Sequence, residues 1–219
     1  MSNKRAELLS WFFIIATIGM AGYFWPMLPD PMPSHWNVQG EVDAWMPKFW
    51  GVAVLPIAAI GLYLLFKAIP YISPKGFRTD AFREVLNIFQ VTLVAFTALI
   101  ALLVFLEATG TDVAMEQTVM AATGVLFLII GNYLGKVRKN FFLGIRTPWT
   151  LASDEVWSRT NRVGGYAFML GGIVMIVGAL TDLRPDWIIG VAVVVAVYPV
   201  LHSYLLYRRI EGFGKDNGA

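Results

Sequence analysis

Long apolar blocks separated by short polar stretches run along the whole of this 219-residue chain. An α-helix needs about 20 apolar residues to cross the hydrocarbon core of a bilayer. The pattern therefore predicts an all-α integral membrane protein with six transmembrane helices. The predicted spans are residues 8–28, 49–69, 85–106, 118–134, 163–180 and 187–207.

The basic residues orient these spans. Because the number of spans is even, both termini share one side of the membrane, and all but two of the 17 lysines and arginines fall on that side. The exceptions are Lys48 and Arg184. Cytoplasmic loops are enriched in Lys and Arg, so we predict an N-in/C-in topology. Lys4 and Arg5 precede the first span and no small-residue cleavage site follows it, which favours a retained helix over a cleaved signal peptide.

The composition also indicates an integral membrane protein, and it excludes several kinds of functional site. Only 15% of the residues are charged, whereas soluble domains carry about 25%. The chain has no cysteine, which excludes disulfides, thiolate metal sites and cysteine nucleophiles. The two histidines, His35 and His202, are predicted on opposite sides of the membrane and cannot share a site. No hydrolase, metalloprotease or phosphate-loop motif is present, and we expect no cofactor and no direct nucleic-acid binding.

Glycines recur at seven-residue intervals in the fifth span and predict one small-residue face for close helix packing. They are Gly164, Gly171 and Gly178, with Gly165 and Gly172 beside them. Pro56 and Pro199 lie inside spans and predict kinks that neighbouring helices stabilise.

The polar stretch at residues 29–48 is predicted to form an ordered outer loop. Its prolines favour an extended backbone, and Asn37 and Gly40 are turn formers. Imidazole and carboxylate groups can together bind a divalent cation, but one histidine with loosely spaced acids is a weak metal signature. We therefore predict no metal, and the weak candidates are His35, Glu41 and Asp43, together with Asp30. The alternative is a hydrogen-bonded cap over the bundle, with Trp36 and Trp45 at the membrane interface.

The second long connection, residues 135–162, is predicted to form an ordered cytoplasmic loop. Its aromatic residues make it too apolar for a solvated tether. Ser153 is a plausible helix N-cap, with acidic residues after it that suit the positive helix end. Arg146 lies between Gly144 and Pro148 and can make a bidentate contact to a carboxylate or phosphate. The basic residues of the loop suit either anionic lipid headgroups or a docking surface for a protein.

Several polar residues lie inside the predicted spans, where they usually face the bundle interior. Four of them fall in the cytoplasmic half and are predicted to form one polar cluster beneath residues 144–151. They are Asn87, Gln90, Asn132 and His202. Hydrogen bonds between helices alone are the alternative explanation.

Two stretches of the sequence carry a family resemblance. Residues 33–43, Pro-Ser-His-Trp-Asn-Val-Gln-Gly-Glu-Val-Asp, are similar to the outer-loop signature of a prokaryotic membrane domain of unknown function. Trp36 stands where that signature has a smaller aromatic residue. Residues 131–162, which include Gly-Ile-Arg-Thr-Pro-Trp-Thr at 144–150, resemble the SdpI family. The resemblance extends over residues 8–207 and divides the chain into an N-terminal membrane domain, residues 1–70, and an SdpI-like domain, residues 71–219.

The resemblance implies a function. The founding SdpI protein is an immunity factor against a secreted membrane-active peptide toxin, and it holds a cognate transcriptional repressor at the membrane when toxin is present. We therefore expect a multi-pass protein of a prokaryotic plasma membrane, with lipids, a peptide toxin outside and a repressor inside as partners. The implied ligand-binding residues of the outer loop are His35, Asn37, Gly40 and Asp43. The implied partner-binding or functional residues of the cytoplasmic loop are Asn140, Gly144, Arg146, Thr147, Pro148, Trp149, Thr150, Trp157 and Asn161.

Two other functions stay open. A small membrane transporter is compatible with intramembrane polar residues and proline-broken spans, but no internal repeat links the first three spans to the last three. A lipid-modifying or metal-dependent membrane enzyme is the third possibility. We favour a protein that is not an enzyme and predict no catalytic residues.

Overall fold

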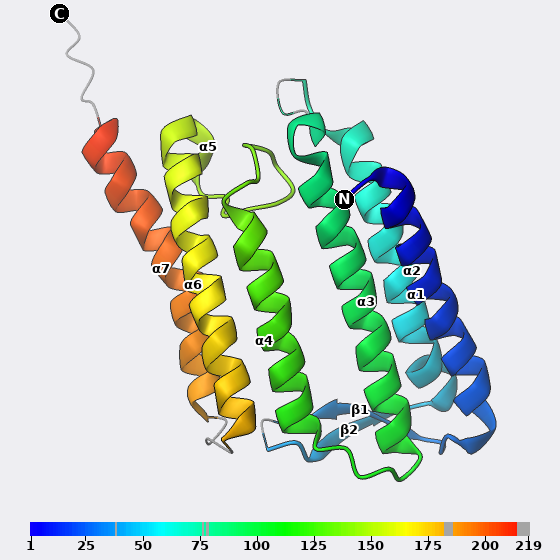
Figure 1. Cartoon of the computed structure of the whole chain (residues 1–219). Helices are drawn as coiled ribbons and strands as arrows, with labels where there is room; N and C mark the ends of the chain where they lie inside the picture. Colours follow the sequence, from blue (N-terminus) through cyan, green and yellow to red (C-terminus); the bar gives the residue numbers. More distant parts are fainter. Residues whose placement is uncertain (38, 76, 78, 182–185, 214–219) are drawn as a thin grey trace, which may run out of the picture.

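The computed structural model describes the chain except residues 38, 76, 78, 182–185 and 214–219. Six of its helices are long and apolar enough to cross a bilayer, which confirms the predicted all-α multi-pass architecture (Figure 1). They are α1 (Asn3–Phe24), α2 (Lys48–Ile72), α3 (Arg83–Ala108), α4 (Met115–Leu134), α6 (Asp154–Leu180) and α7 (Asp186–Ile210). Pro56 and Pro199 lie inside α2 and α7, as predicted.

Each helix begins before its predicted apolar span, whereas α1 ends at Phe24, before the predicted end at residue 28. The largest difference is at α6. This helix begins at Asp154, so residues 154–162 of the predicted cytoplasmic loop are helical. Ser153 is the N-cap, as expected, and its hydroxyl accepts a hydrogen bond from the backbone N–H of Val156 at 3.4 Å. Asp154 and Glu155 then lie in the first turn, where negative charge stabilises a helix. Capping and charge thus extend the helix where the apolar pattern alone does not.

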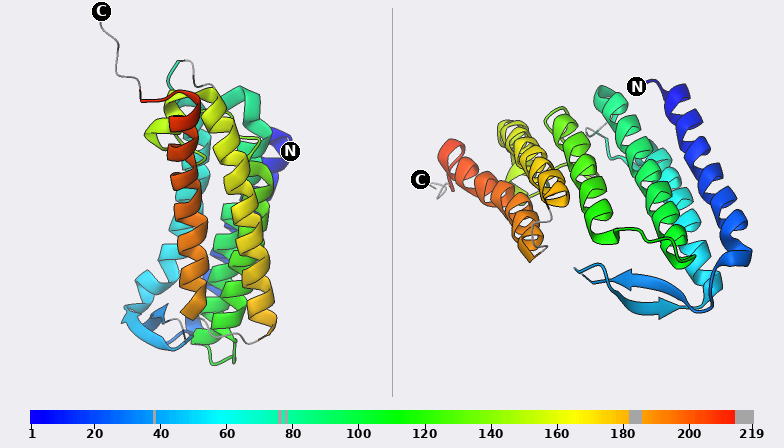
Figure 2. Two further views of the ribbon diagram at one scale, coloured as in Figure 1. Left: turned by 90° about the vertical axis from the view of Figure 1, so that its left-hand side faces the viewer. Right: turned by 60° about the horizontal axis from the view of Figure 1, so that its bottom comes forward.

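The six helices form two groups of three. In the first group α3 packs against both α1 and α2, and in the second α6 packs between α4 and α7. The groups meet where α4 passes α3, over a much smaller contact (Figures 1 and 2). The division into domains at residue 70 stays a prediction.

The start of α1 and the end of α7 lie at one end of the bundle, which we call the terminal end (Figure 1). A two-stranded antiparallel hairpin covers the opposite end, which we call the hairpin end. Its strands are β1 (Met32–Trp36) and β2 (Val42–Met46). The side of the membrane that each end faces stays a prediction. Two of the basic residues that carry it, Arg78 and Lys215, and one of the two exceptions, Arg184, lie outside the described residues.

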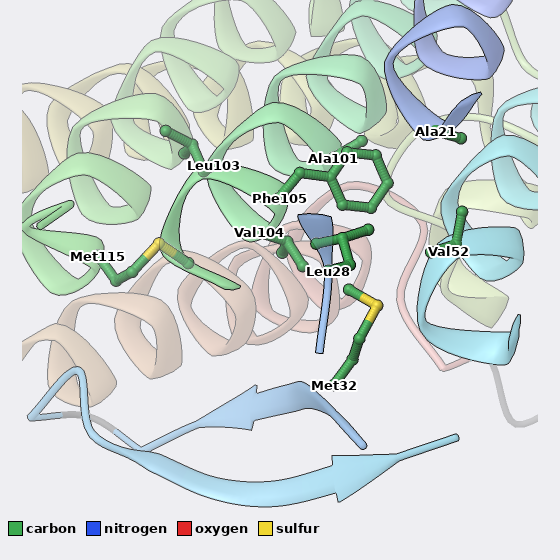
Figure 3. Packing of buried hydrophobic residues seen from close by; sticks show 9 residues of the cluster. All are labelled: Ala21, Leu28, Met32, Val52, Ala101, Leu103, Val104, Phe105 and Met115. Atoms are coloured by element: carbon green, nitrogen blue, oxygen red, sulfur yellow. The ribbon is translucent and has the colours of Figure 1, made fainter. Parts of the chain in front are cut away.

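The hairpin is anchored to the first group of helices by a buried apolar cluster (Figure 3). Met32 on β1 is fully buried and lies against Gly51 of α2, where a Cβ atom would be only 2.9 Å from the Met32 Cβ. Phe105 of α3 and Leu28 belong to the same cluster. From this anchor the hairpin reaches under the second group, and its turn lies beneath α4 (Figure 1).

The glycines of α6 face two neighbouring helices, whereas the sequence predicted one small-residue face. A Cβ at Gly165 would lie 2.6 Å from the carbonyl oxygen of Gly131 on α4, and a Cβ at Gly172 would lie 2.5 Å from that of Gly124. Gly171 instead lies against α7, where a Cβ would be 2.6 Å from a methyl group of Val195. Adjacent residues on a helix point about 100° apart, so paired glycines necessarily serve two faces.

Candidate functional site

The two predicted functional loops lie at opposite ends of the bundle. The outer loop forms the hairpin, and the cytoplasmic loop lies at the terminal end, where it includes the short helix α5 (Pro148–Ala152) (Figure 1). We call residues 135–153 the inner loop. Residues from the two loops cannot form one site, so each end is described separately.

Asn37 builds the turn of the hairpin. Its side-chain oxygen accepts hydrogen bonds from the backbone N–H groups of Gln39 at 3.0 Å and Glu41 at 2.9 Å. Gly40 has a φ of +78°, a left-handed conformation that favours glycine. A Cβ at Gly40 would lie 3.3 Å from the Cβ of Glu116 on α4. These two residues therefore shape the turn and set it against α4.

His35 and Asp43 are brought together across the hairpin. The Nδ1 atom of His35 lies 2.5 Å from Oδ1 of Asp43, and both side chains are largely exposed. Glu41 does not join them, because its carboxylate accepts a hydrogen bond from Asn37 at 3.1 Å. Asp30 accepts one from the backbone N–H of Lys48 at 3.2 Å. Within the described part of the chain no three His, Asp or Glu side chains are arranged to hold a metal ion, so the weak candidate set is not assembled.

A cavity of about 600 Å³ lies at the hairpin end. Its walls come from α2, α3, α4, α6 and α7, and the hairpin closes one end. Of the predicted ligand-binding residues, His35, Asn37 and Gly40 line it and Asp43 does not. Glu116, in the first turn of α4, also lines it and was not predicted. The signal that could have identified it is a single acid at the edge of an apolar span.

At the other end, Asn140 organises the first turn of the inner loop. The side chain is fully buried. Its oxygen accepts from the backbone N–H groups of Phe142 at 2.7 Å and Leu143 at 2.8 Å. Its amide donates to the carbonyl oxygens of Arg138 at 2.7 Å and Leu143 at 3.0 Å. All of its hydrogen-bonding capacity is therefore used to hold the loop.

Three further predicted residues, Gly144, Trp157 and Asn161, lock the inner loop onto α6. The side-chain oxygen of Asn161 accepts from the backbone N–H of Ile145 at 2.8 Å. Gly144 has a φ of +104°, and a Cβ there would lie 2.7 Å from that same oxygen. The indole N–H of Trp157 donates to the carbonyl oxygen of Val137 at 2.8 Å. Each of these groups is occupied within the protein.

Thr147 and Thr150 begin helix α5 and connect it to α7. They form a capping box in which each side chain accepts a hydrogen bond from the other's backbone N–H. The hydroxyl of Thr147 also lies 3.0 Å from that of Ser203 on α7. Trp149 packs edge-on against Tyr204 of α7, with 5.1 Å between ring centroids. The inner loop thus contacts both α6 and α7.

Arg146 and Pro148 are the two predicted inner-loop residues that remain exposed. The guanidinium of Arg146 donates to the carbonyl oxygen of Phe141, and the rest of the group faces outward. Exposed Arg138 and Arg162 add positive charge to the same end. This surface is suited to an anionic partner, whether a lipid headgroup or an acidic protein face.

The four intramembrane polar residues do not form the single predicted cluster. Asn87 donates to Asn3 Oδ1 at 2.7 Å, and Gln90 donates to the Ser10 hydroxyl at 2.9 Å, so both join α3 to α1. His202 is half-buried on α7. Asn132 is exposed, because its neighbour Gly131 occupies the position that faces α6. The division into two helix groups separates the first pair from the second.

Two regions of the chain match known protein families. Residues 12–60 match a domain of unknown function (DUF1648). Residues 136–203 match the SdpI/YfhL protein family. The chain carries an SdpI-family domain. It is also similar to Immunity protein SdpI of Bacillus subtilis (strain 168), with 24% identity over 189 residues that cover 84% of this chain and 87% of that protein. No solved structure matches it.

The SdpI-family match covers the inner loop, α5, α6 and most of α7. The other match begins within α1 and ends within α2, so it includes the whole hairpin. The predicted resemblance is thus confirmed, and with six helices able to span a bilayer the protein is a multi-pass protein of the plasma membrane.

Proposed function

We propose that this protein is a membrane immunity protein that protects its cell against a secreted, membrane-active peptide toxin. We further propose that it holds a cognate transcriptional repressor at the membrane while toxin is present. The observation that carries the proposal is the similarity to Immunity protein SdpI, which extends over most of both chains. The folded inner loop, which lies within the SdpI-family match, supports the same conclusion.

The placement of the two loops suits such a role. The hairpin end has a cavity large enough for a ligand, since ligand sites occupy about 300–1,000 Å³. The terminal end presents a rigid loop whose buried polar groups are engaged within the protein and whose exposed groups are basic. A sensor needs a ligand surface on one side of the membrane and a partner surface on the other, and the separation of these two features at opposite ends supports that role.

Heterologous protection tests the immunity role. The chain is expressed in a Bacillus subtilis strain from which SdpI has been deleted, and that strain is grown with its toxin-producing parent. Survival of the deletion strain should rise at least tenfold over an empty vector, and a potentiometric dye should report less membrane depolarisation. Equal killing with and without the protein, at membrane levels that match those of SdpI, would contradict the proposal.

The repressor role needs a separate readout. The candidate partner is any transcriptional repressor encoded beside the gene, and a fluorescent fusion of it should move from the nucleoid to the membrane when toxin is added. The movement should require the protein and should fail with Arg146→Ala, which removes the exposed guanidinium and leaves the buried hydrogen bonds of the loop intact. Protection without any movement of the repressor would separate the two roles and leave immunity alone.

A further inference from the structure

The cavity at the hairpin end has walls of a single chemical character. Apolar side chains from three membrane-spanning helices line it, among them Val54 and Leu55 of α2, Ile100 and Val104 of α3, and Val119 and Phe127 of α4. Such walls favour an apolar ligand, because the removal of apolar surface from water is favourable in proportion to the area buried. The walls alone do not distinguish a lipid chain from an apolar peptide.

The closed end of the cavity is acidic. Glu116 is half-buried there, and across the described residues its carboxylate has neither a hydrogen bond nor an ion pair. No lysine or arginine lines the described cavity, and Lys48 nearby donates to the carbonyl oxygen of Leu28 at 2.7 Å. His35 lines the same end but is paired with Asp43. Among the described residues, the cavity therefore offers a carboxylate without a matching cation.

This charge distribution selects between occupants. An anionic phospholipid would bring a net negative charge close to Glu116, and like charges at short range in a partly buried site repel each other. A peptide segment with apolar side chains and one ammonium or guanidinium group would fill the walls and pair with the carboxylate. The aromatic ring of Trp36, which also lines the cavity, is a further favourable neighbour for a cation.

We propose that this cavity binds an apolar peptide segment that carries a cation, with the cation at Glu116. The inference rests on the proposed function, which supplies a peptide as ligand, and it adds the place and the chemistry of recognition. The hairpin turn lies directly on the first turn of α4, where a Cβ at Gly40 would be 3.4 Å from the backbone nitrogen of Glu116. A cation bound there would contact the turn as well as the carboxylate.

Photo-crosslinking of the full-length protein in lipid nanodiscs tests the site. The probe is a ten-residue peptide of leucine and alanine with one photoreactive leucine and one central lysine. Matched probes replace the lysine with norleucine or with glutamate. We expect the lysine probe to label the α4 segment, residues 115–127, about tenfold more than the norleucine probe. One charge-assisted hydrogen bond from the lysine ammonium to the Glu116 carboxylate corresponds to an affinity difference of about that size. The glutamate probe should label it least.

Three variants locate the interaction. Glu116→Gln keeps the shape of the side chain and should remove the preference for lysine. Val119→Trp fills the cavity and should abolish labelling by every probe. Val125→Trp is the matched control, because Val125 lies on the same helix but is 48% exposed on the outer surface of the bundle. It should label as the unmodified protein does.

The results separate this inference from the proposed function. Equal labelling by the three probes, or a lysine preference that survives Glu116→Gln, would overturn the inference. A lipid site would also overturn the inference. It would be identified if a photoreactive phospholipid labels the protein, Val119→Trp abolishes that labelling, and the peptide probes do not label. Failure of crosslinking together with protection of cells leaves the immunity role standing. Crosslinking as expected without protection of cells would support the peptide site and contradict the immunity role.

Discussion

The side-chain oxygen of Asn161 on α6 accepts a hydrogen bond from the backbone N–H of Ile145 in the inner loop at 2.8 Å. Asn161 is fully buried and its amide is also used, donating to the carbonyl oxygen of Trp157 at 3.0 Å. The oxygen occupies the space that a side chain on Gly144 would need. One buried amide thus fixes the path of the loop at the point where it turns towards α5.

Removal of this amide should loosen the inner loop. Asn161→Ala leaves the Ile145 N–H buried without its acceptor, and an unsatisfied buried donor costs about 1–3 kcal/mol. We expect a lower midpoint of thermal unfolding in detergent and faster hydrogen exchange across residues 144–157, with other segments unchanged. Arg162→Ala, at an exposed neighbouring position, is the control. Unchanged exchange in the Asn161 variant would mean that the loop is held by other contacts.

The glycine contacts between α4 and α6 should tolerate no side chain. A Cβ at Gly131 would lie 2.6 Å from the carbonyl oxygen of Gly165 and 2.9 Å from the backbone nitrogen of Met169. Because backbone atoms cannot move aside cheaply, Gly131→Ala should destabilise the protein by about 2–3 kcal/mol. Asn132→Ala, one residue away on the exposed face, should have little effect. Thermal unfolding monitored by gel filtration compares them, and equal behaviour would show that the helices can separate freely.

The topology inferred from basic residues can be tested directly because the chain has no cysteine. Gln39→Cys lies in the exposed hairpin turn and Ser158→Cys in the exposed first turns of α6. An impermeant maleimide should label the first in intact cells and the second only after permeabilisation. The reverse pattern would place the hairpin in the cytoplasm and would reverse the roles proposed for the two ends.

The sequence predicts the membrane architecture well because span length and hydropathy are imposed by the bilayer. It also identifies Asn140, Gly144, Thr147 and Asn161, although it assigns them to a partner surface. In the structure they hydrogen-bond or pack within the inner loop, on α6 and on α7. Their pairing depends on which helices are neighbours, and periodicity does not contain that information. The same limit explains why Asn87 and Asn132, predicted to join one polar cluster, lie in different helix groups.

The cavity at the hairpin end could not be predicted from the sequence either, because it also depends on which helices are neighbours. Its walls come from five helices and the hairpin, so no local pattern describes it. The β-strands were also missed, because three prolines in residues 29–33 argue for extended backbone without indicating a partner strand. Glu116 carried a usable signal, since a single acid in the first turn of an apolar helix is unusual enough to examine.

The hairpin turn should depend on the left-handed conformation of Gly40. Gly40→Ala adds a Cβ at a φ of +78° and brings it to 3.3 Å from the Cβ of Glu116. We expect the variant to insert normally and to lose most lysine-probe labelling, because a displaced turn alters the acidic end of the cavity. Gly110→Ala is a control with a similar φ of +84° and open space around it. If both variants lose lysine-probe labelling equally, backbone strain alone accounts for the effect.

Arg146 should act through its planar guanidinium and not through charge alone. The group is exposed, and one of its nitrogens donates to the carbonyl oxygen of Phe141, which leaves the rest of the fork for a carboxylate or phosphate. Arg146→Lys keeps the charge and loses bidentate geometry, so we expect at least a tenfold loss of protection or of repressor recruitment with unchanged thermal stability. Arg138→Lys, at another exposed arginine of the inner loop, should retain both activities. If both variants lose activity equally, the surface recognises positive charge in general, as an anionic lipid surface would require, and the site at Arg146 is not specific.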